Sequence, residues 1–353
     1  PKELKEKLNQ KDIKIIETGI SHGTLTVIVN KKKFEITTLR KDIITDGRHA
    51  KVDFTSDWTK DSLRRDLTIN SIYADIDGKF FDPQNGIADL KKGIVQFIGL
   101  PEERIKEDYL RILRYFRFFA EYSKIDHDKD IIQSIKQNIN GINKISNERI
   151  FDEVKKILSI KNVHSLFSND KSKEILLNIF PQFKYYKRLK IFESLNRRLK
   201  SNYDYKLILA LLIVDETDNY EFFCFKYKTP NSLKEFFKTF SKNFKNLKSK
   251  KFYSEENIKK ILYFNGKKNV LDILLFSKCS NNILKNDDFE KILEFSKKCK
   301  VPEFPISGDD LKKYGYESGE VLGKKLKSLE EKWIENNFIM EKKLLEKSLN
   351  KTN

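Results

Sequence analysis

Cysteine and long apolar runs are scarce in this sequence, and their scarcity excludes several classes of protein. The three cysteines, Cys224, Cys279 and Cys299, are isolated from one another and from the four histidines. This spacing excludes a disulfide framework and a zinc site, and it predicts a reducing, cytoplasmic location. No apolar run reaches about 18 residues, so we expect no membrane-spanning segment. The first residues do not follow a signal-peptide pattern.

Methionine is almost absent. The chain begins at Pro1 and its single methionine is Met340, so we expect that residues upstream of Pro1 are missing from this sequence. At 353 residues the chain is long enough for two or three domains. Its 27 phenylalanines can build hydrophobic cores, which excludes a disordered chain.

Positive charge is abundant but unevenly distributed. Residues 1–150 contain 28 Lys and Arg against 24 Asp and Glu, whereas residues 151–353 contain 42 against 28. A basic half of this size predicts binding to a polyanion such as nucleic acid, although a Lys-rich surface that serves only solubility has the same composition. Only 12 residues are Arg, and eight of them lie between Arg40 and Arg117. This cluster indicates sites that need a planar, forked donor, such as phosphates or base edges.

The sequence pattern changes near residue 100. Residues 1–98 predict strands at 24–30 and 33–40, a mobile polar loop at 42–58 and a hairpin turn at Asp77-Gly78. From Pro101 onward Gly and Pro become scarce and apolar residues recur every three or four positions, which predicts helices almost throughout. The predicted fold class is therefore α+β: a small mixed β-sheet with helices, followed by an extended all-α part.

Residues 107–119, EDYLRILRYFRFF, predict one helix with an apolar stripe and many charges. Asp108 and Arg111 are three residues apart and would share a face. An acceptor beside a forked donor matches the amino group and ring nitrogen of cytosine and adenine, but it mismatches guanine and uracil. One such pair can therefore select C and A without a nucleic-acid template. The alternative is a Glu107–Arg111 salt bridge with only a structural role.

Two further motifs contain candidate residues. In SLRRDLTIN, Arg65 can hold a triphosphate, while Asp66 and Asn70 can bond ribose hydroxyls. A capped helix with a surface ion pair is the alternative. In the predicted strand FEITTLR, Glu35 lies on the face opposite its apolar neighbours. Its carboxylate can bind a metal or orient a nucleophile, unless that face of the sheet is simply solvated.

Together RRDLTIN, FDPQNGIADL and EDYLRILRYFRF resemble motifs of the class II tRNA nucleotidyltransferases, the CCA-adding enzymes. ISGDDL and GYESGEVLGKKLKSLEEKW resemble the C-terminal segment of that family, so the resemblance covers residues 15–120 and 306–335. It implies that Asp108 and Arg111 pair with incoming CTP or ATP, and that Glu35 lies near the metals. The remaining implied contacts are to the phosphates (Arg65, Arg114 and Arg117) and to the ribose (Asp66 and Asn70).

The resemblance also implies a domain order and a function. Residues 1–98 would be the remainder of the nucleotidyltransferase head, 99–165 a nucleotide-selecting neck, and 166–353 a basic body and tail that bind tRNA. The implied activity is template-independent transfer of CMP and AMP from CTP and ATP to the tRNA 3′ end. The expected partners are tRNA, CTP and ATP, with no membrane. The oligomeric state does not follow from the sequence.

One family motif is missing. The family has a glycine pair followed by Asp-x-Asp just before a segment like PKELKEKL, whereas this chain has no adjacent glycines and begins at that segment. We therefore expect Mg²⁺ to be bound by a carboxylate pair upstream of Pro1, and this stretch alone to be unable to transfer a nucleotide. Two alternatives stay open: a poly(A) polymerase of the same superfamily, which C incorporation would exclude, and a non-catalytic tRNA- or RNA-binding protein.

Overall fold

The computed structural model describes residues 2–8, 13–19, 23–45, 50–195, 203–281 and 283–339. The chain divides into two compact units. Unit 1 comprises Pro1–Glu193 and Glu221–Asn231, and unit 2 comprises Ser194–Tyr220 and Ser232–Asn353. All the candidate site residues predicted from the sequence belong to unit 1.

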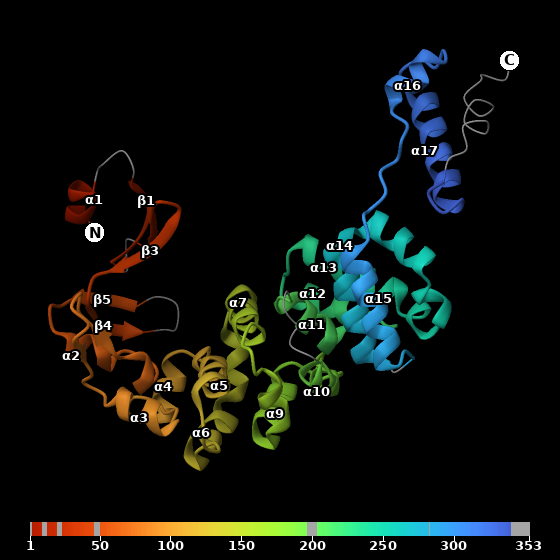
Figure 1. The fold of residues 1–353 in the computed structure, drawn as a ribbon. Helices are drawn as coiled ribbons and strands as arrows, with labels where there is room; N and C mark the ends of the chain where they lie inside the picture. Colours follow the sequence, from red (N-terminus) through yellow and green to blue (C-terminus); the bar gives the residue numbers. More distant parts are fainter. Residues whose placement is uncertain are drawn as a thin grey trace. The chain divides into compact units, whose positions relative to one another are not determined.

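Unit 1 begins with a small β region (Figure 1). Its first elements are α1 (Lys2–Lys7), a three-stranded sheet in the order β1 (Ile13–Gly19), β2 (Thr24–Val29) and β3 (Lys32–Thr37), and a two-stranded sheet of β4 (Arg40–Thr45) and β5 (Ala50–Phe54). The predicted α+β class is confirmed. The sheet was expected to be mixed, but every strand pair among the described residues is antiparallel.

The turn between β2 and β3 shows how local sequence sets the register. Asn30 and Lys31 both have positive φ, at 49° and 64°, as a two-residue hairpin turn of the favoured type requires. The register places Glu35 opposite Thr26. The prediction of a loop over 42–58 is wrong for the residues of β4 and β5, which pair as antiparallel strands. Residues 46–49 lie outside the described residues.

A second hairpin follows the short helix α2 (Trp58–Leu63) and the 3₁₀ turn η2 (Thr68–Asn70). It joins β6 (Tyr73–Ala74) to β7 (Phe80–Phe81) through Gly78, whose φ is 80°. The predicted turn at Asp77-Gly78 is confirmed. Asp75 itself accepts from the backbone N–H groups of Asp77 and Lys79.

The FDPQNG segment positions η2. Asp82 accepts from the backbone N–H groups of Gly86 and Ile87, both at 2.8 Å, and so starts helix α3 (Gly86–Lys92). A Cβ added at Gly86 would lie 2.2 Å from the Thr68 carbonyl oxygen. Only glycine therefore allows α3 to approach the backbone between Asp66 and Asn70.

The rest of unit 1 is helical in the described residues. Its helices are α4 (Pro101–Glu107), α5 (Arg111–Tyr122), α6 (Lys129–Asn138), η3 (Ile139–Lys144), α7 (Asn147–Leu158), α8 (His164–Ser168), α9 (Asp170–Ile179), α10 (Lys187–Ser194) and α12 (Asn219–Lys226), the last two extending by sequence into unit 2. The prediction of one helix over 107–119 is wrong. Asp108 is extended, with φ −154° and ψ 105°, and it separates α4 from α5.

One local and one tertiary contact stabilise this break. The Asp108 side chain accepts from the Leu110 backbone N–H at 3.2 Å, and such a bond competes with helix continuation. Tyr109 lies against Gly141, where an added Cβ would lie 2.0 Å from the ring. Asp108 and Arg111 therefore do not share a face of one helix, although the Arg111 N–H still donates to the Asp108 carbonyl oxygen at 3.0 Å.

Unit 2 is all-helical in its described part. It contains α11 (Tyr205–Ile213), α13 (Asn231–Asn243, apart from its first residue), η4 (Asn246–Lys248), η5 (Lys250–Tyr253), α14 (Glu255–Ser280), α15 (Asn286–Lys298), α16 (Gly308–Lys313) and α17 (Glu320–Glu335). Residues 207–213 of α11 are all buried, and α14 kinks at Gly266 (φ 72°, ψ 161°). Among the described helices, none has the length and apolar character needed to cross a membrane.

We predict that Gly86→Ala destabilises unit 1 by about 1–3 kcal/mol, because the new methyl group overlaps backbone atoms of Thr68 that are not free to move. Each unit contains one tryptophan, Trp58 in unit 1 and Trp333 in unit 2. Urea unfolding of unit 1 is therefore followed by Trp58 fluorescence in a Trp333→Phe background.

The matched control for this experiment is Gly323→Ala in α17, where an added Cβ meets no atom within 4 Å. In a Trp58→Phe background this change should raise the stability of unit 2 by about 0.5–1 kcal/mol, because alanine is the better helix former. An unchanged urea midpoint for Gly86→Ala would show that α3 does not pack closely against the Thr68 carbonyl group of η2.

Candidate functional site

Asp61 is the centre of the first part of the site. Its side chain is fully buried in α2 and accepts from Arg64 Nε and Nη2, Arg65 Nη2, Tyr73 Oη and the Arg40 backbone N–H. Burial opposes ionisation, but these donors outweigh it and lower the Asp61 pKa. Burial and the bond to Asp61 raise the Tyr73 pKa to about 12. Asp61 thus fixes Arg65, whose guanidinium stays partly exposed near the Tyr73 ring.

Asp66 connects the RRDLTIN segment to α5. Its Oδ1 accepts from Asn70 Nδ2 at 2.9 Å, and its Oδ2 accepts from Arg114 Nε. Burial raises the Asp66 pKa, but the Arg114 bond and charge outweigh burial, so the net shift is downward. The same pairing overcomes burial at Arg114 and raises its pKa. The structure therefore brings together Asp66, Asn70 and Arg114, as the sequence motifs predicted for a shared site.

Arg111 begins α5 and is held by three groups from two segments, α4 and the RRD segment. It donates to Glu107, to the Arg104 carbonyl oxygen at 2.8 Å and to the Arg64 carbonyl oxygen at 3.2 Å. The Glu107–Arg111 bridge considered from the sequence is therefore present. It coexists with the contact to the RRD segment, so Arg111 is not a surface residue: its side chain is only 12% exposed.

Asp108 is bound by a residue from another helix. Its Oδ2 accepts from Arg149 Nη2 of α7 at 2.6 Å, while its Oδ1 accepts from the Leu110 N–H. Arg117 of α5 donates through Nε to Glu153, also of α7, and stacks on Phe118 with its guanidinium carbon 4.2 Å from the ring centroid. Helix α7 thus contacts both Asp108 and Arg117.

Four residues that hold this site together were not predicted from the sequence: Asp61, Arg104, Arg149 and Glu153. Arg104 donates to both carboxylate oxygens of Glu107 and to the Arg65 carbonyl oxygen. A signal existed for Glu153, because it falls on the buried stripe of α7 between Ile150 and Ile157. A carboxylate at such a position needs a partner. Arg149 lies four residues earlier and so on the same side of that helix.

Glu35 lies on β3, whose side chains are exposed along the whole strand. It is 30 residues or more along the chain from every other predicted site residue. In the residues that the structure describes, no group of three or more His, Cys, Asp and Glu side chains is arranged to hold a metal ion. The described residues therefore do not fit a complete metal site, and we assign no reaction step to a metal.

Helix α5 is also anchored from its far side. Tyr115 Oη lies 2.9 Å from His127 Nδ1, and His127 Nε2 bonds Ser172 Oγ of α9. The Phe119 ring stacks on the imidazole with centroids 3.5 Å apart. Burial lowers the His127 pKa to about 4, so this histidine is neutral at pH 7. The four side chains fix one face of α5, while its arginines point to the other network.

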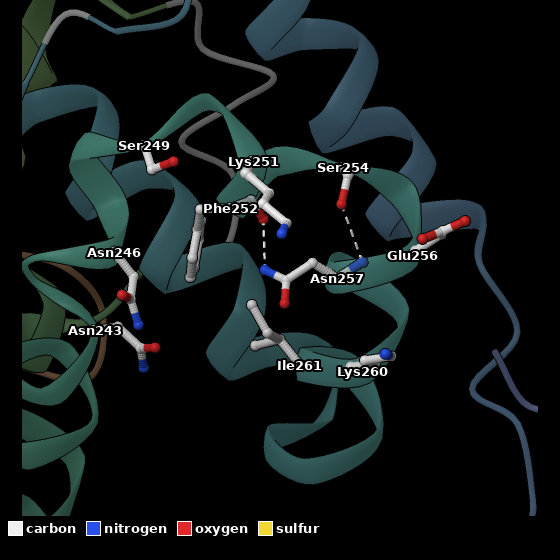
Figure 2. Close-up of a pocket in the computed structure, with 10 residues that line it drawn as sticks. All are labelled: Asn243, Asn246, Ser249, Lys251, Phe252, Ser254, Glu256, Asn257, Lys260 and Ile261. Atoms are coloured by element: carbon white, nitrogen blue, oxygen red, sulfur yellow. Dashed lines mark hydrogen bonds between the residues drawn. The ribbon is translucent and has the colours of Figure 1, made fainter. Parts of the chain in front are cut away.

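Unit 2 contains a cavity of about 350 Å³ beside the first turns of α14 (Figure 2). Asn257 Nδ2 donates to the Phe252 carbonyl oxygen at 2.7 Å, and the Asn257 N–H donates to Ser254 Oγ. Lys251 and Lys260 line the same cavity, together with the single acid Glu256. Amides, hydroxyls and two ammonium groups suit a ligand that offers phosphate and hydroxyl groups.

Three family models match successive parts of the chain: the poly A polymerase head domain (residues 1–96), the RNA and SrmB binding site of polymerase A (126–187) and tRNA nucleotidyltransferase domain 2 (200–349). Among curated proteins, the mitochondrial CCA tRNA nucleotidyltransferase 1 of Mus musculus is 36% identical over 361 residues. The match covers all of this chain and 80% of that protein. The Homo sapiens protein of the same name is 34% identical with the same coverage.

Solved structures share the fold. The Bacillus stearothermophilus CCA-adding enzyme in complex with CTP matches with a TM-score of 0.66 at 22% identity, covering 92% of this chain and 80% of that chain. The Thermotoga maritima CCA-adding enzyme complexed with tRNA matches with a TM-score of 0.59 at 19% identity, covering 99% and 82%.

The buried His127 generates a pH prediction. Its pKa is about 4 in the folded protein against 6.5 for the free side chain, so the unfolded chain binds more protons between these values. The contribution of neutral His127 to the free energy of unfolding is fully present above pH 6.5. It falls by about 3 kcal/mol as the pH decreases toward 4. His127→Gln should lack this component. The measurement is urea unfolding of unit 1 at pH 4.5, 5.5 and 7 for both proteins. Equal pH slopes would contradict a neutral, buried His127.

Proposed function

The chain belongs to the class II CCA-adding tRNA nucleotidyltransferases, and on this premise we propose that the network around Asp108 and Arg111 selects its nucleotides. The reaction is template-independent transfer of CMP and AMP from CTP and ATP to the 3′ end of tRNA. In that reaction the tRNA 3′ hydroxyl attacks the α-phosphorus and pyrophosphate leaves.

One observation carries the proposal: residues from two distant motifs meet in a single hydrogen-bonded network. Arg111 reaches the Arg64 carbonyl oxygen, and Arg114 reaches Asp66. Segments 64–70 and 104–117 are therefore joined by hydrogen bonds and together carry several guanidinium groups. A surface salt bridge on an isolated helix would not require these contacts.

The residues can be given roles by their exposure and bonds. Arg65 is the most exposed arginine of the network and is proposed to bind the triphosphate, with Arg114 and Arg117 beside it. Asp66 is 5% exposed and both its oxygens are bonded, so we propose that it acts on the ribose mainly through Asn70. Asp108 accepts from the base amino group, and Arg111 donates to the adjacent ring nitrogen.

Enzymes of this family use a divalent metal ion. We propose that the ion is Mg²⁺, because phosphate oxygens are the hard ligands that Mg²⁺ prefers. Glu35 stays a proposed contributor on the family resemblance alone. Its exposure on β3 is compatible with that role, and no step of the reaction is derived from it.

We propose that the basic body and tail, residues 166–353, bind tRNA. Support comes from the excess of Lys in residues 151–353 and from the basic cavity beside α14. The division into a head (1–98), a neck (99–165) and a body with tail (166–353) also remains our proposal. The head domain model, which matches residues 1–96, supports its first boundary. The cytoplasmic location stays a prediction, since the mouse and human relatives are named mitochondrial.

A poly(A) polymerase remains the second candidate, because a poly A polymerase head model matches residues 1–96. The decisive assay uses the full-length protein with tRNA lacking its 3′ CCA, a divalent metal and the four nucleoside triphosphates, supplied singly and together. Incorporation of CMP followed by AMP supports CCA addition. Incorporation of AMP alone would favour the polymerase, and binding of tRNA without CTP or ATP binding would favour a non-catalytic RNA-binding protein.

Asp108→Ala should loosen nucleotide choice more than it weakens tRNA binding. Without the Asp108 carboxylate, the amino groups of CTP and ATP lose their hydrogen-bond acceptor. The protein's preference for CTP and ATP over UTP and GTP should therefore fall about tenfold or more. Equilibrium binding of the four nucleotides measures this, and a filter assay measures tRNA affinity, expected to change less than twofold. Asp77→Ala in the exposed β6–β7 turn is the matched control. Unchanged discrimination in Asp108→Ala would remove Asp108 from base selection.

Lys251→Glu combined with Lys260→Glu should weaken tRNA binding and flatten its salt dependence. Each lysine that neutralises a phosphate adds about 0.7–0.9 to the slope of log affinity against log salt, so the pair should remove roughly 1.5. Titrations at 50–200 mM salt measure the slope. Lys91→Glu, on the exposed side of α3 in unit 1, is the control and should leave it unaltered. An unaltered slope in the double variant would exclude the cavity from the tRNA interface.

A further inference from the structure

Asp108 stands in a backbone conformation that does not by itself fix its side chain. The residue is extended and lies between α4 and α5, so its backbone belongs to neither helix. Two bonds determine the orientation of the group: the Leu110 N–H donates to Oδ1 at 3.2 Å, and Arg149 Nη2 donates to Oδ2 at 2.6 Å. The bond from Arg149 is the shorter and the charged one, so it is the stronger constraint.

Arg149 is in turn set by a well-packed helix. Ile150, Val154 and Ile157 of α7 are buried, and α7 packs against α5. Glu153, one turn after Arg149, is 1% exposed and accepts from Arg117. Because Glu153 ties α7 to α5, the position from which Arg149 reaches Asp108 is fixed relative to the helix that carries Arg111.

We propose that Arg149 is a positioning residue that sets nucleotide selectivity by holding the Asp108 carboxylate in one plane. This inference rests on the proposed role of Asp108 in base selection. Each carboxylate oxygen has two lone pairs. The Leu110 N–H and Arg149 each use one, which leaves the other lone pairs in a fixed direction for the amino group of cytosine or adenine.

A carboxylate that rotates freely can accept hydrogen bonds from more than one donor on the base edge. Uracil and guanine also offer a donor on this edge, the ring N–H, but it lies one position away from the amino group of cytosine and adenine. A fixed oxygen meets only the amino group. An oxygen that can turn reaches the ring N–H as well, so loss of Arg149 should weaken CTP and strengthen UTP. A residue that merely stabilises the fold would weaken both alike.

The test measures equilibrium dissociation constants of CTP and UTP for the whole chain, with ATP and GTP as the purine pair. In Arg149→Ala the Kd for UTP divided by the Kd for CTP should fall about tenfold. A change of this size corresponds to the loss of one hydrogen bond to a base edge. Arg149→Lys should recover at least half of the lost discrimination on a logarithmic scale, because one N–H bond to Oδ2 carries the effect. Lys155→Ala, on the same helix in a surface pair with Asp152, is the control and should leave the ratio unchanged.

The outcomes separate two failures. If the wild-type chain prefers CTP and Arg149→Ala keeps the same ratio, Arg149 does not position Asp108 and this inference is wrong. If the wild-type chain shows no preference, the proposed role of Asp108 fails first and the inference falls with it. Thermal melting of each variant is recorded beside the Kd values. If Arg149→Ala does not fold, Arg149→Lys becomes the deciding variant. Its Kd for UTP divided by its Kd for CTP must then be lower than in the wild type, or the inference is wrong.

Discussion

Three buried carboxylates determine the arrangement of unit 1. Asp61, Asp66 and Glu153 are each no more than 5% exposed, and each binds at least one arginine from the site. An ionised carboxylate that loses its partner in such a place costs several kcal/mol, so the pairs cannot separate while the fold persists. The arginines are therefore positioned by the protein before any ligand arrives. Ordering their long side chains does not have to be repeated at each binding event.

The break between α4 and α5 adds a second constraint, which acts on Asp108 and Arg111. A continuous helix would keep Asp108 in the helical backbone and could not form the side-chain bond to the Leu110 N–H. The break instead lets Asp108 meet Arg149 of α7, while Arg111 remains with Glu107 and the Arg64 carbonyl oxygen. The acceptor and the donor are thus held by separate partners. Each can be oriented toward a base edge without forming an ion pair with the other.

Much of this arrangement could be predicted from the sequence, because the motifs are local. The β2–β3 hairpin, the Asp77-Gly78 turn and the change to helices after residue 100 follow from residue type and periodicity. The break at Asp108 could not, since Leu110 and Leu113 continue the helical spacing and the deciding contact of Tyr109 with Gly141 is tertiary. Asp61 was missed for a related reason: a single acid in a short helix shows its burial only when Arg40, Arg64 and Tyr73 surround it.

Arginine and lysine contribute two different kinds of electrostatic interaction in this chain. In unit 1 the arginines around Asp61 and Asp66 are partly buried, so dissolved salt screens their interactions weakly. In unit 2 the positive charge is carried by lysines such as Lys251, whose compact and strongly hydrated ammonium groups act as exposed point charges. Ionic strength should therefore act on the affinity for a polyanion far more than on the choice between bases. The affinity for a polyanion and the choice between bases can then vary independently.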